Sequence, residues 1–332
     1  MQVLHLQSNT CFDGSNAAKW YKAFMEWPDY DIRDYVPPHE WIMKSFMTPL
    51  NFLFPLKCEG LENIPANGRY LMVGNHQNMI MDTSSFFTFV FWNTGKWVRP
   101  MTDRSHYTIP FFKHYIQYVG GFAGTPENCE KMMEAGKPLL VYPGGASEVF
   151  KDERIPPYTL MWSDRAGFAK LAAKHNYTII PFASVGFEDV FKIWFSIPAY
   201  WLYMLLGDKR GKSEYAKFKA AQIGSPTTSP TSEFSKGYIP SPVPDSRIPV
   251  YAPWTFRAQK NYIVFGKAIE TVEFNATNKE SVFELRDVAR DSVQECINRA
   301  KEMQANDPER YTNVLAGILG EKGNGKAKSK EE

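Results

Sequence analysis

The sequence lacks an apolar run of the roughly 20 residues that a helix needs to cross a bilayer. Its longest apolar stretch, residues 193–206, is shorter and contains Pro198, and a second stretch, residues 41–56, carries Lys44 and two prolines. We expect both to lie in the plane of a membrane surface, although buried core helices share this composition. No charged segment followed by a cleavable apolar region opens the chain, so secretion is not expected.

An excess of charge of one sign is also missing. The chain has 38 basic and 36 acidic residues, which predicts no nucleic-acid partner. Its four cysteines show no C-x-x-C spacing and its six histidines show no metal-ligand spacing. The cysteines are therefore interpreted as core thiols, and neither a metal nor a cofactor is expected. Aromatic residues, at 15%, are abundant and clustered, which is typical of an interface.

Short apolar runs alternate with helix-like stretches between residues 57 and 305. The runs cover residues 69–73, 139–142, 177–181 and 262–265, and the helix-like stretches include 127–135, 165–174 and 279–304. Because strands that alternate with helices build sheets covered on both faces, the pattern predicts an α/β fold.

The rest of the chain differs from this domain in composition. Residues 1–56 are predicted to form an N-terminal arm associated with a membrane. Residues 224–253 form an insertion rich in Pro and Ser that cannot be a helix or a central strand, and residues 306–332 are expected to be a largely disordered basic tail. The last five residues fit a Lys-x-Lys-x-x pattern, which weakly favours the endoplasmic reticulum, with the site facing the cytosol.

A first candidate motif, GNHQNMIMD, directly follows the apolar run at 69–73. A His at the end of a strand in an open sheet can reach a ligand, and an Asp six residues later can return through a helical turn to orient it. His76 and Asp82 are therefore candidates for a base and its partner. The same residues also fit a capped helix start with a hydrogen-bonded histidine.

A second candidate motif, LLVYPGGASE, ends another apolar run with Pro143, Gly144 and Gly145. Bare backbone N–H groups at such a turn can hold an anionic oxygen, although the pattern also suits a plain turn between a strand and a loop.

Together the two motifs resemble the PlsC-like glycerophospholipid acyltransferases, in the branch of plant phytyl ester synthases and animal diacylglycerol-acylating proteins. The Arg165 to Ala169 stretch (RAGFA), Ile180-Pro181 and the residues 265–269 resemble further blocks of that branch. The resemblance implies a mixed, mostly parallel sheet flanked by helices, and acyl transfer from acyl-CoA, as co-substrate, to a lipid hydroxyl at a membrane surface. It implies catalysis by His76 and Asp82, and substrate or oxyanion binding by Asn75, Pro143, Gly144, Gly145 and Glu148.

Several departures from the family pattern bear on the acceptor. One extra residue separates His76 from Asp82, no Arg follows the Gly120 to Thr125 stretch, and Gly144 replaces the acidic residue of a Pro-Glu-Gly turn. A relative's phosphate-binding Arg is thus absent. We expect a neutral acceptor such as diacylglycerol, monoacylglycerol or a long-chain alcohol.

Three alternatives remain open from the sequence. The chain could be a lysophospholipid acyltransferase with a phosphorylated acceptor, or an inactive lipid-binding relative. It could also be a lipid hydrolase that uses Ser147, since Gly145 to Val149 (GASEV) nearly matches G-x-S-x-G. Val149 replaces the final Gly, and only His175 lies downstream as a triad histidine.

Overall fold

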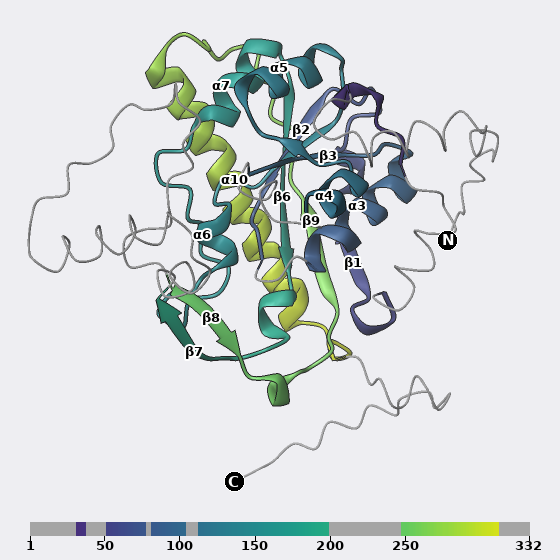
Figure 1. The fold of residues 1–332 in the computed structure, drawn as a ribbon, viewed down its shortest axis with the longest axis vertical. Coiled ribbons are helices and arrows are strands. Elements are labelled where there is room, and N and C mark those ends of the chain that lie inside the picture. Colours follow the sequence, from purple (N-terminus) through teal and green to yellow (C-terminus); the bar gives the residue numbers. More distant parts are fainter. Residues whose placement is uncertain (1–30, 38–50, 78–80, 104–111, 199–246, 312–332) are drawn as a thin grey trace, which may run out of the picture.

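The centre of the molecule is a seven-stranded sheet with the order β1-β9-β6-β2-β5-β3-β4 (Figure 1). The computed structural model describes residues 31–37, 51–77, 81–103, 112–198 and 247–311. The strands are β1 (Leu56–Glu59), β2 (Tyr70–Gly74), β3 (Arg99–Thr102), β4 (Phe122–Ala123), β5 (Leu139–Val141), β6 (Thr178–Val185) and β9 (Asn261–Phe265). Neighbours pair in parallel except β6 and β9, which are antiparallel. The expected mixed, mostly parallel sheet is confirmed.

Helices cover both faces of this sheet. Those longer than two turns are α3 (Met81–Thr94), α5 (Pro126–Glu134), α7 (Gly167–His175) and α10 (Lys279–Ala305), and the shorter ones include α4 (Phe112–Tyr118) and α6 (Ala146–Val149). Buried residues of α5, α7 and α10 share one core cluster with Leu71 and Val73, whereas Phe86 and Phe87 of α3 share a second cluster with Tyr70 and Met72. Successive residues of β2 thus face opposite cores, because strand side chains alternate in direction.

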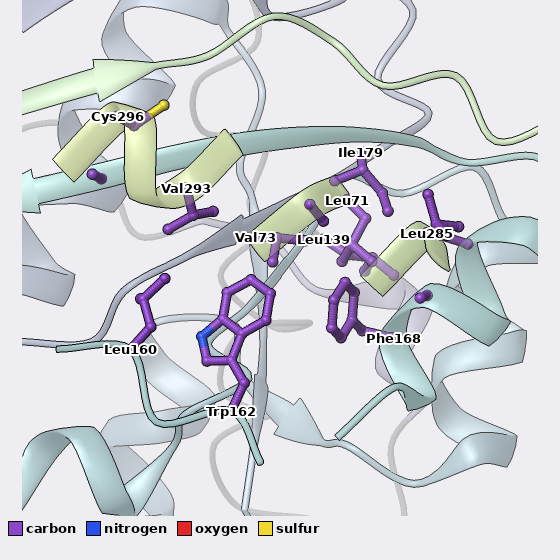
Figure 2. Close-up of a cluster of buried hydrophobic side chains, with 14 of the residues drawn as sticks. Leu71, Val73, Leu139, Leu160, Trp162, Phe168, Ile179, Leu285, Val293 and Cys296 are labelled. Carbon is purple, nitrogen blue, oxygen red and sulfur yellow. The ribbon is translucent and has the colours of Figure 1, made fainter. Parts of the chain in front are cut away.

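The loop that precedes α7 packs beneath the end of β2. Trp162 is 1% exposed, and its ring meets that of Phe168 edge to face at 5.5 Å. Figure 2 shows the two rings next to Val73 of β2 and Leu139 of β5, and all four residues belong to one core cluster. This packing fixes the loop before α7 against β2 and β5.

The C-terminal end of α10 is attached to β1 and β9 through Asp307. Its carboxylate lies 2.6 Å from the Lys57 ammonium and 3.2 Å from that of Lys260, and it accepts the Tyr262 hydroxyl at 2.9 Å. Burial raises the pKa of Asp307, but these hydrogen bonds together outweigh burial and hold the pKa at about 2.

The four predicted strands and the three predicted helices are confirmed, with ends that differ by a few residues. The sequence reading missed β1, β3 and β4. Strand β3 was missed because it begins with Arg99 and Pro100, which are not typical of a buried strand. Arg99 is nevertheless only 3% exposed, and its guanidinium donates to the carbonyls of Gly120 and Ile32. The core-thiol interpretation holds for Cys129 and Cys296, which are buried, while Cys58 is half-buried.

A separate two-stranded ribbon corrects the interpretation of residues 193–206 as an interfacial or core helix. Residues Ile193–Pro198 form strand β7, which pairs antiparallel with β8 (Arg247–Tyr251), so the end of the Pro-rich insertion is ordered. Pro249 is tolerated because a two-stranded ribbon has free edges. Residues 199–206, most of the insertion, most of the arm and most of the tail lie outside the described residues. No described helix combines the length and apolar character needed to cross a bilayer.

Candidate active site at the carboxyl ends of β2 and β5

The segment after β2 is fixed to β6 by the side chain of Asn75. This residue is 1% exposed, its amide nitrogen donates to the Ser184 carbonyl at 2.9 Å, and its amide oxygen accepts the Ser184 N–H at 2.9 Å. The side chain thereby continues the β2–β6 hydrogen-bond ladder beyond the strand. Asn75 was expected to touch substrate, but here it is buried and positions the residue that follows it.

Gln77 fixes the other side of His76. Its amide nitrogen donates to the Ser184 hydroxyl at 2.6 Å, and its amide oxygen accepts the N–H groups of Phe187 at 2.8 Å and Glu188 at 3.4 Å. The side chains of Asn75 and Gln77 therefore fix the chain to β6 on both sides of His76. The half-buried His76 ring stacks on Tyr142, just after β5, with centroids 4.2 Å apart.

A buried carboxylate holds the backbone of His76. Glu148 of α6 is 0% exposed, and its two oxygens accept the N–H groups of His76 at 2.7 Å and Met161 at 2.9 Å. Burial raises the pKa of Glu148, and these hydrogen bonds and nearby Lys151 oppose the rise. Glu148 was expected to bind substrate or an oxyanion. Its burial makes it a residue that positions His76.

The same carboxylate explains the glycine at position 144. A Cβ placed on Gly144 would lie 2.0 Å from Glu148 Cδ and 2.1 Å from Oε1, so any side chain there would overlap the carboxyl group. Proteins with a Pro-Glu-Gly turn carry an acidic side chain at the position of Gly144. Here the carboxylate of Glu148, four residues downstream, occupies the space that a side chain at position 144 would fill.

The Pro-Gly-Gly turn is held by Arg165. One guanidinium nitrogen donates to the carbonyls of Pro143 at 2.7 Å and Gly144 at 2.6 Å. Burial lowers the pKa of Arg165, and the nearby Glu148 carboxylate opposes this. Gly145 has φ +50° and its N–H donates to the Tyr142 carbonyl at 3.0 Å. Since that N–H is bonded within the turn, the structure does not support Gly145 as an oxyanion donor.

A buried ion pair lies behind this edge of the sheet. Lys151 and Glu188 meet at 2.6 Å with side chains 1% and 2% exposed, and Glu188 also accepts the Tyr158 N–H at 2.9 Å. Burial raises the pKa of Glu188, and Lys151 opposes the rise. Sequence reasoning missed both residues, because Lys151 lies in a charged run that is typical of a surface and Glu188 follows a strand without a motif.

Asp82 belongs to the first turn of α3, which begins at Met81. This backbone position agrees with the expected helical turn after His76. The Asp82 side chain and residues 78–80 lie outside what the structure describes. The contact between His76 and Asp82 therefore stays a prediction.

Ser147 and His175 lie at opposite edges of the sheet. Ser147 belongs to α6, after the carboxyl end of β5, while His175 ends α7 and its carbonyl accepts from Arg69, just before the amino end of β2. Since β5, β2 and β6 run parallel, these residues do not form the dyad that a hydrolase would need. Within the described ranges, no three His, Cys, Asp or Glu side chains form a metal-binding group.

Comparison with known proteins identifies a family that this chain resembles. Residues 55–185 match the family model described as Acyltransferase. That range contains both motifs, and the resemblance stated from the sequence is confirmed.

Individual relatives extend the comparison. The bovine "DGAT1/2-independent enzyme synthesizing storage lipids" (Bos taurus) is 27% identical over 136 residues, covering 41% of this chain and 40% of the relative. Phytyl ester synthase 2 of Arabidopsis thaliana is 27% identical over 272 residues, covering 78% of this chain and 36% of the relative. The matches thus span well under half of these relatives.

One similar solved structure is the crystal structure of the 1-acyl-sn-glycerophosphate acyltransferase PlsC from Thermotoga maritima. It aligns with a TM-score of 0.44 at 15% identity, covering 85% of this chain and 88% of that chain.

Proposed function

We propose that this protein is an acyl-CoA-dependent acyltransferase that esterifies the hydroxyl of a neutral lipid. The observation that carries the proposal is the placement of His76. Its backbone is bonded to buried Glu148, its neighbours Asn75 and Gln77 are bonded to β6 and the segment after it, and its ring is left half-buried at the carboxyl edge of the sheet. Ligands of open α/β sheets bind at this edge.

The reaction follows from a base at that position. His76 removes the proton of the acceptor hydroxyl, whose oxygen attacks the thioester carbonyl carbon of acyl-CoA. The new C–O bond forms the ester, the C–S bond breaks, and His76 returns the proton to the thiolate of the departing CoA. Asp82 is proposed to orient the imidazole and stabilise its charged form. The chemistry needs no covalent enzyme intermediate and no cofactor.

The proposal of a neutral acceptor is supported by the partners of the cations around the site. Arg165 is bonded to turn carbonyls, Lys151 is paired with Glu188, and Arg154 is paired with Asp152 at 2.5 Å. A phosphate would have to compete with these intramolecular partners, and breaking the buried Lys151–Glu188 pair costs about 3–5 kcal/mol.

A second observation concerns Thr125, the last residue of the 120–125 stretch, after which the family that the sequence resembles carries an Arg. It is the N-cap of α5, and its hydroxyl accepts the Asn128 N–H at 3.2 Å. The names of the relatives, which refer to storage lipids and phytyl esters, also favour neutral products. A lysophospholipid acceptor and an inactive lipid-binding role are the alternatives that an assay has to separate.

The experiment uses the purified full chain with labelled oleoyl-CoA and a panel of diacylglycerol, monoacylglycerol, phytol and lysophosphatidic acid. We expect ester formation with neutral acceptors, and a loss of on the order of 100-fold or more in His76→Ala, because a general base is removed. His175→Ala, a histidine at the opposite edge of the sheet, is the matched control and should retain turnover. Thermal melts of both variants verify folding.

Three outcomes separate the candidates. Near-normal turnover in folded His76→Ala contradicts the mechanism, preference for lysophosphatidic acid contradicts the acceptor, and absence of transfer to the whole panel favours the binding relative.

We further propose that the protein works at a membrane, with the endoplasmic reticulum as the compartment. Fractionation of cells that express the tagged chain tests this.

A further inference from the structure

The β7–β8 ribbon carries a group of exposed aromatic rings, here called the aromatic tip: Trp194, Phe195, Trp254 and Phe256. Their side chains are 62%, 42%, 70% and 44% exposed, respectively. Trp254 belongs to the short 3-10 helix Pro253–Thr255 that follows β8. Figure 1 shows the ribbon at the lower left, apart from the central sheet. Large apolar side chains gathered on a surface mark an interaction site.

An irregular register brings these rings together. Ile193 pairs with Tyr251 but Phe195 pairs with Val250, so Trp194 is an extra residue in β7. A bulge of this kind redirects side chains, and it explains why two consecutive residues, Trp194 and Phe195, are both exposed. The Trp194 ring lies 5.0 Å from that of Phe195 and 5.1 Å from that of Trp254, so the three form one continuous surface.

The aromatic tip is anchored on a packed base. The centroid of the Phe256 ring lies 5.2 Å from that of Phe191 and 6.3 Å from that of Phe54, and Phe54 is 1% exposed. In addition, the Lys192 carbonyl accepts the Ala252 N–H at 2.9 Å. The rings therefore lie on a supported element, which lowers the entropy cost of holding them toward a partner.

The segments that carry the aromatic tip are basic, and one of their cations, Lys260, is paired with Asp307 and Glu309. Residues 190–198 and 247–260 contain four cations and no carboxylate; the cations are Lys192, Arg247, Arg257 and Lys260. Lys192 and Arg257 are exposed. Aromatic rings flanked by cations match the interface of an anionic bilayer, where rings enter the headgroup region and cations approach lipid phosphates.

The ribbon also lies at the same edge of the sheet as the candidate site. It follows the 3-10 helix Phe187–Asp189, and the N–H groups of Phe187 and Glu188 bond to Gln77, next to His76. We propose that the aromatic tip docks the protein on an anionic lipid surface and thereby brings the His76 edge to membrane-borne acceptor. The functional part of this inference rests on the proposed acyl transfer, whereas the docking itself does not.

Vesicle flotation of the full chain tests the docking. The vesicles contain phosphatidylcholine with or without about one third phosphatidylglycerol. We expect Trp194→Ser with Trp254→Ser to weaken binding at least tenfold, the effect of withdrawing large apolar side chains from an apolar phase. We expect Lys192→Glu with Arg257→Glu to remove the preference for the anionic vesicles.

The matched control is Val272→Ser. Val272 is 73% exposed but lies beside Thr271, whose hydroxyl donates to the carbonyls of Ala172 and Tyr177 at the amino end of β6, opposite the candidate site. This variant should bind vesicles as the wild type does. Melting curves confirm that all variants fold, which is expected because the replaced side chains are exposed.

A local readout separates the aromatic tip from any other membrane-binding segment. An environment-sensitive fluorophore on Trp194→Cys should shift to the blue when anionic vesicles are added, and the same label on Val272→Cys should not. An unchanged spectrum at position 194, wild-type flotation of the double Trp variant, or a changed oligomeric state in that variant overturns the proposal.

If the tip variant is active on detergent-dispersed acceptor but not on vesicle-borne acceptor, docking and acyl transfer are both supported. If no variant or wild type transfers acyl groups while the label still shifts, only the proposed function fails.

Discussion

Replacing Glu148 tests whether a buried carboxylate sets the position of the proposed base. The group is 0% exposed and accepts two backbone N–H groups, from His76 and Met161. Glutamine retains one acceptor oxygen, so one of these N–H groups faces an amide NH₂. A buried donor without a partner costs about 1–3 kcal/mol. We therefore expect Glu148→Gln to lower the free energy of unfolding by about 2 kcal/mol, and Glu148→Ala by about 4–6 kcal/mol, since it also leaves a cavity.

The expected effect on activity is larger than stability alone explains. Without the Glu148 bond the His76 backbone shifts, and a displacement of about 1 Å at a catalytic group costs roughly 100-fold. We expect kcat of Glu148→Gln to fall by about 10- to 100-fold with KM little changed. Urea unfolding and oleoyl-CoA turnover measure the two effects, and Glu153→Gln, which replaces an exposed carboxylate in the loop after α6, is the control.

A relocated carboxylate gives the sharper version of this test. Because a Cβ on Gly144 would lie 2.0 Å from Glu148 Cδ, and φ of Gly144 lies outside the left-handed region, an Asp at this position can fill the same volume. Gly144→Asp should therefore restore part of the activity when combined with Glu148→Ala. Wild-type turnover and stability in Glu148→Gln, or a double variant no better than Glu148→Ala alone, would refute the reasoning.

Three further predictions use the same assays. Gly144→Ala alone should lower the free energy of unfolding by about 2 kcal/mol or more and reduce turnover, because its methyl group overlaps the immobile Glu148 carboxylate; an unaltered urea midpoint argues against the overlap. Ser147→Ala should retain most activity, and mass spectrometry should detect no acyl-Ser147 in the wild type, whereas a trapped acyl-serine would indicate a hydrolase. The Asp307 pKa of about 2 lies below its ordinary value of 3.8, so its stabilisation is present above pH 3.8 and lost as pH falls through about 2. Asp307→Asn should thus be less stable than the wild type at pH 7, by about 1–2 kcal/mol, and their melting temperatures should converge toward pH 2.

Local patterns predicted much of the fold. The runs that became β2, β5, β6 and β9 are mostly apolar because their residues are buried on both faces of the sheet, so these strands could be predicted without a structure. β3 was not, because Arg99 looks exposed until the carbonyls of Gly120 and Ile32 are brought to it. The ribbon was missed for a related reason: an aromatic run fits a strand, an interfacial helix or a core helix equally well until its pairing partner, some fifty residues away, is known.

The sequence by itself determined where the candidate site lies, since a histidine after a buried strand and a Pro-Gly-Gly turn after its parallel neighbour both lie at the carboxyl edge of the sheet. Tertiary structure alone decided what the surrounding residues do. The side chains of Asn75 and Glu148 are buried and bonded to backbone groups, Arg165 holds the turn, and the Gly145 N–H is bonded within that turn. The physical reason is that a hydrogen-bonding group acquires its role from its partner, and these partners, except within the turn itself, lie 13 to 109 positions away along the chain.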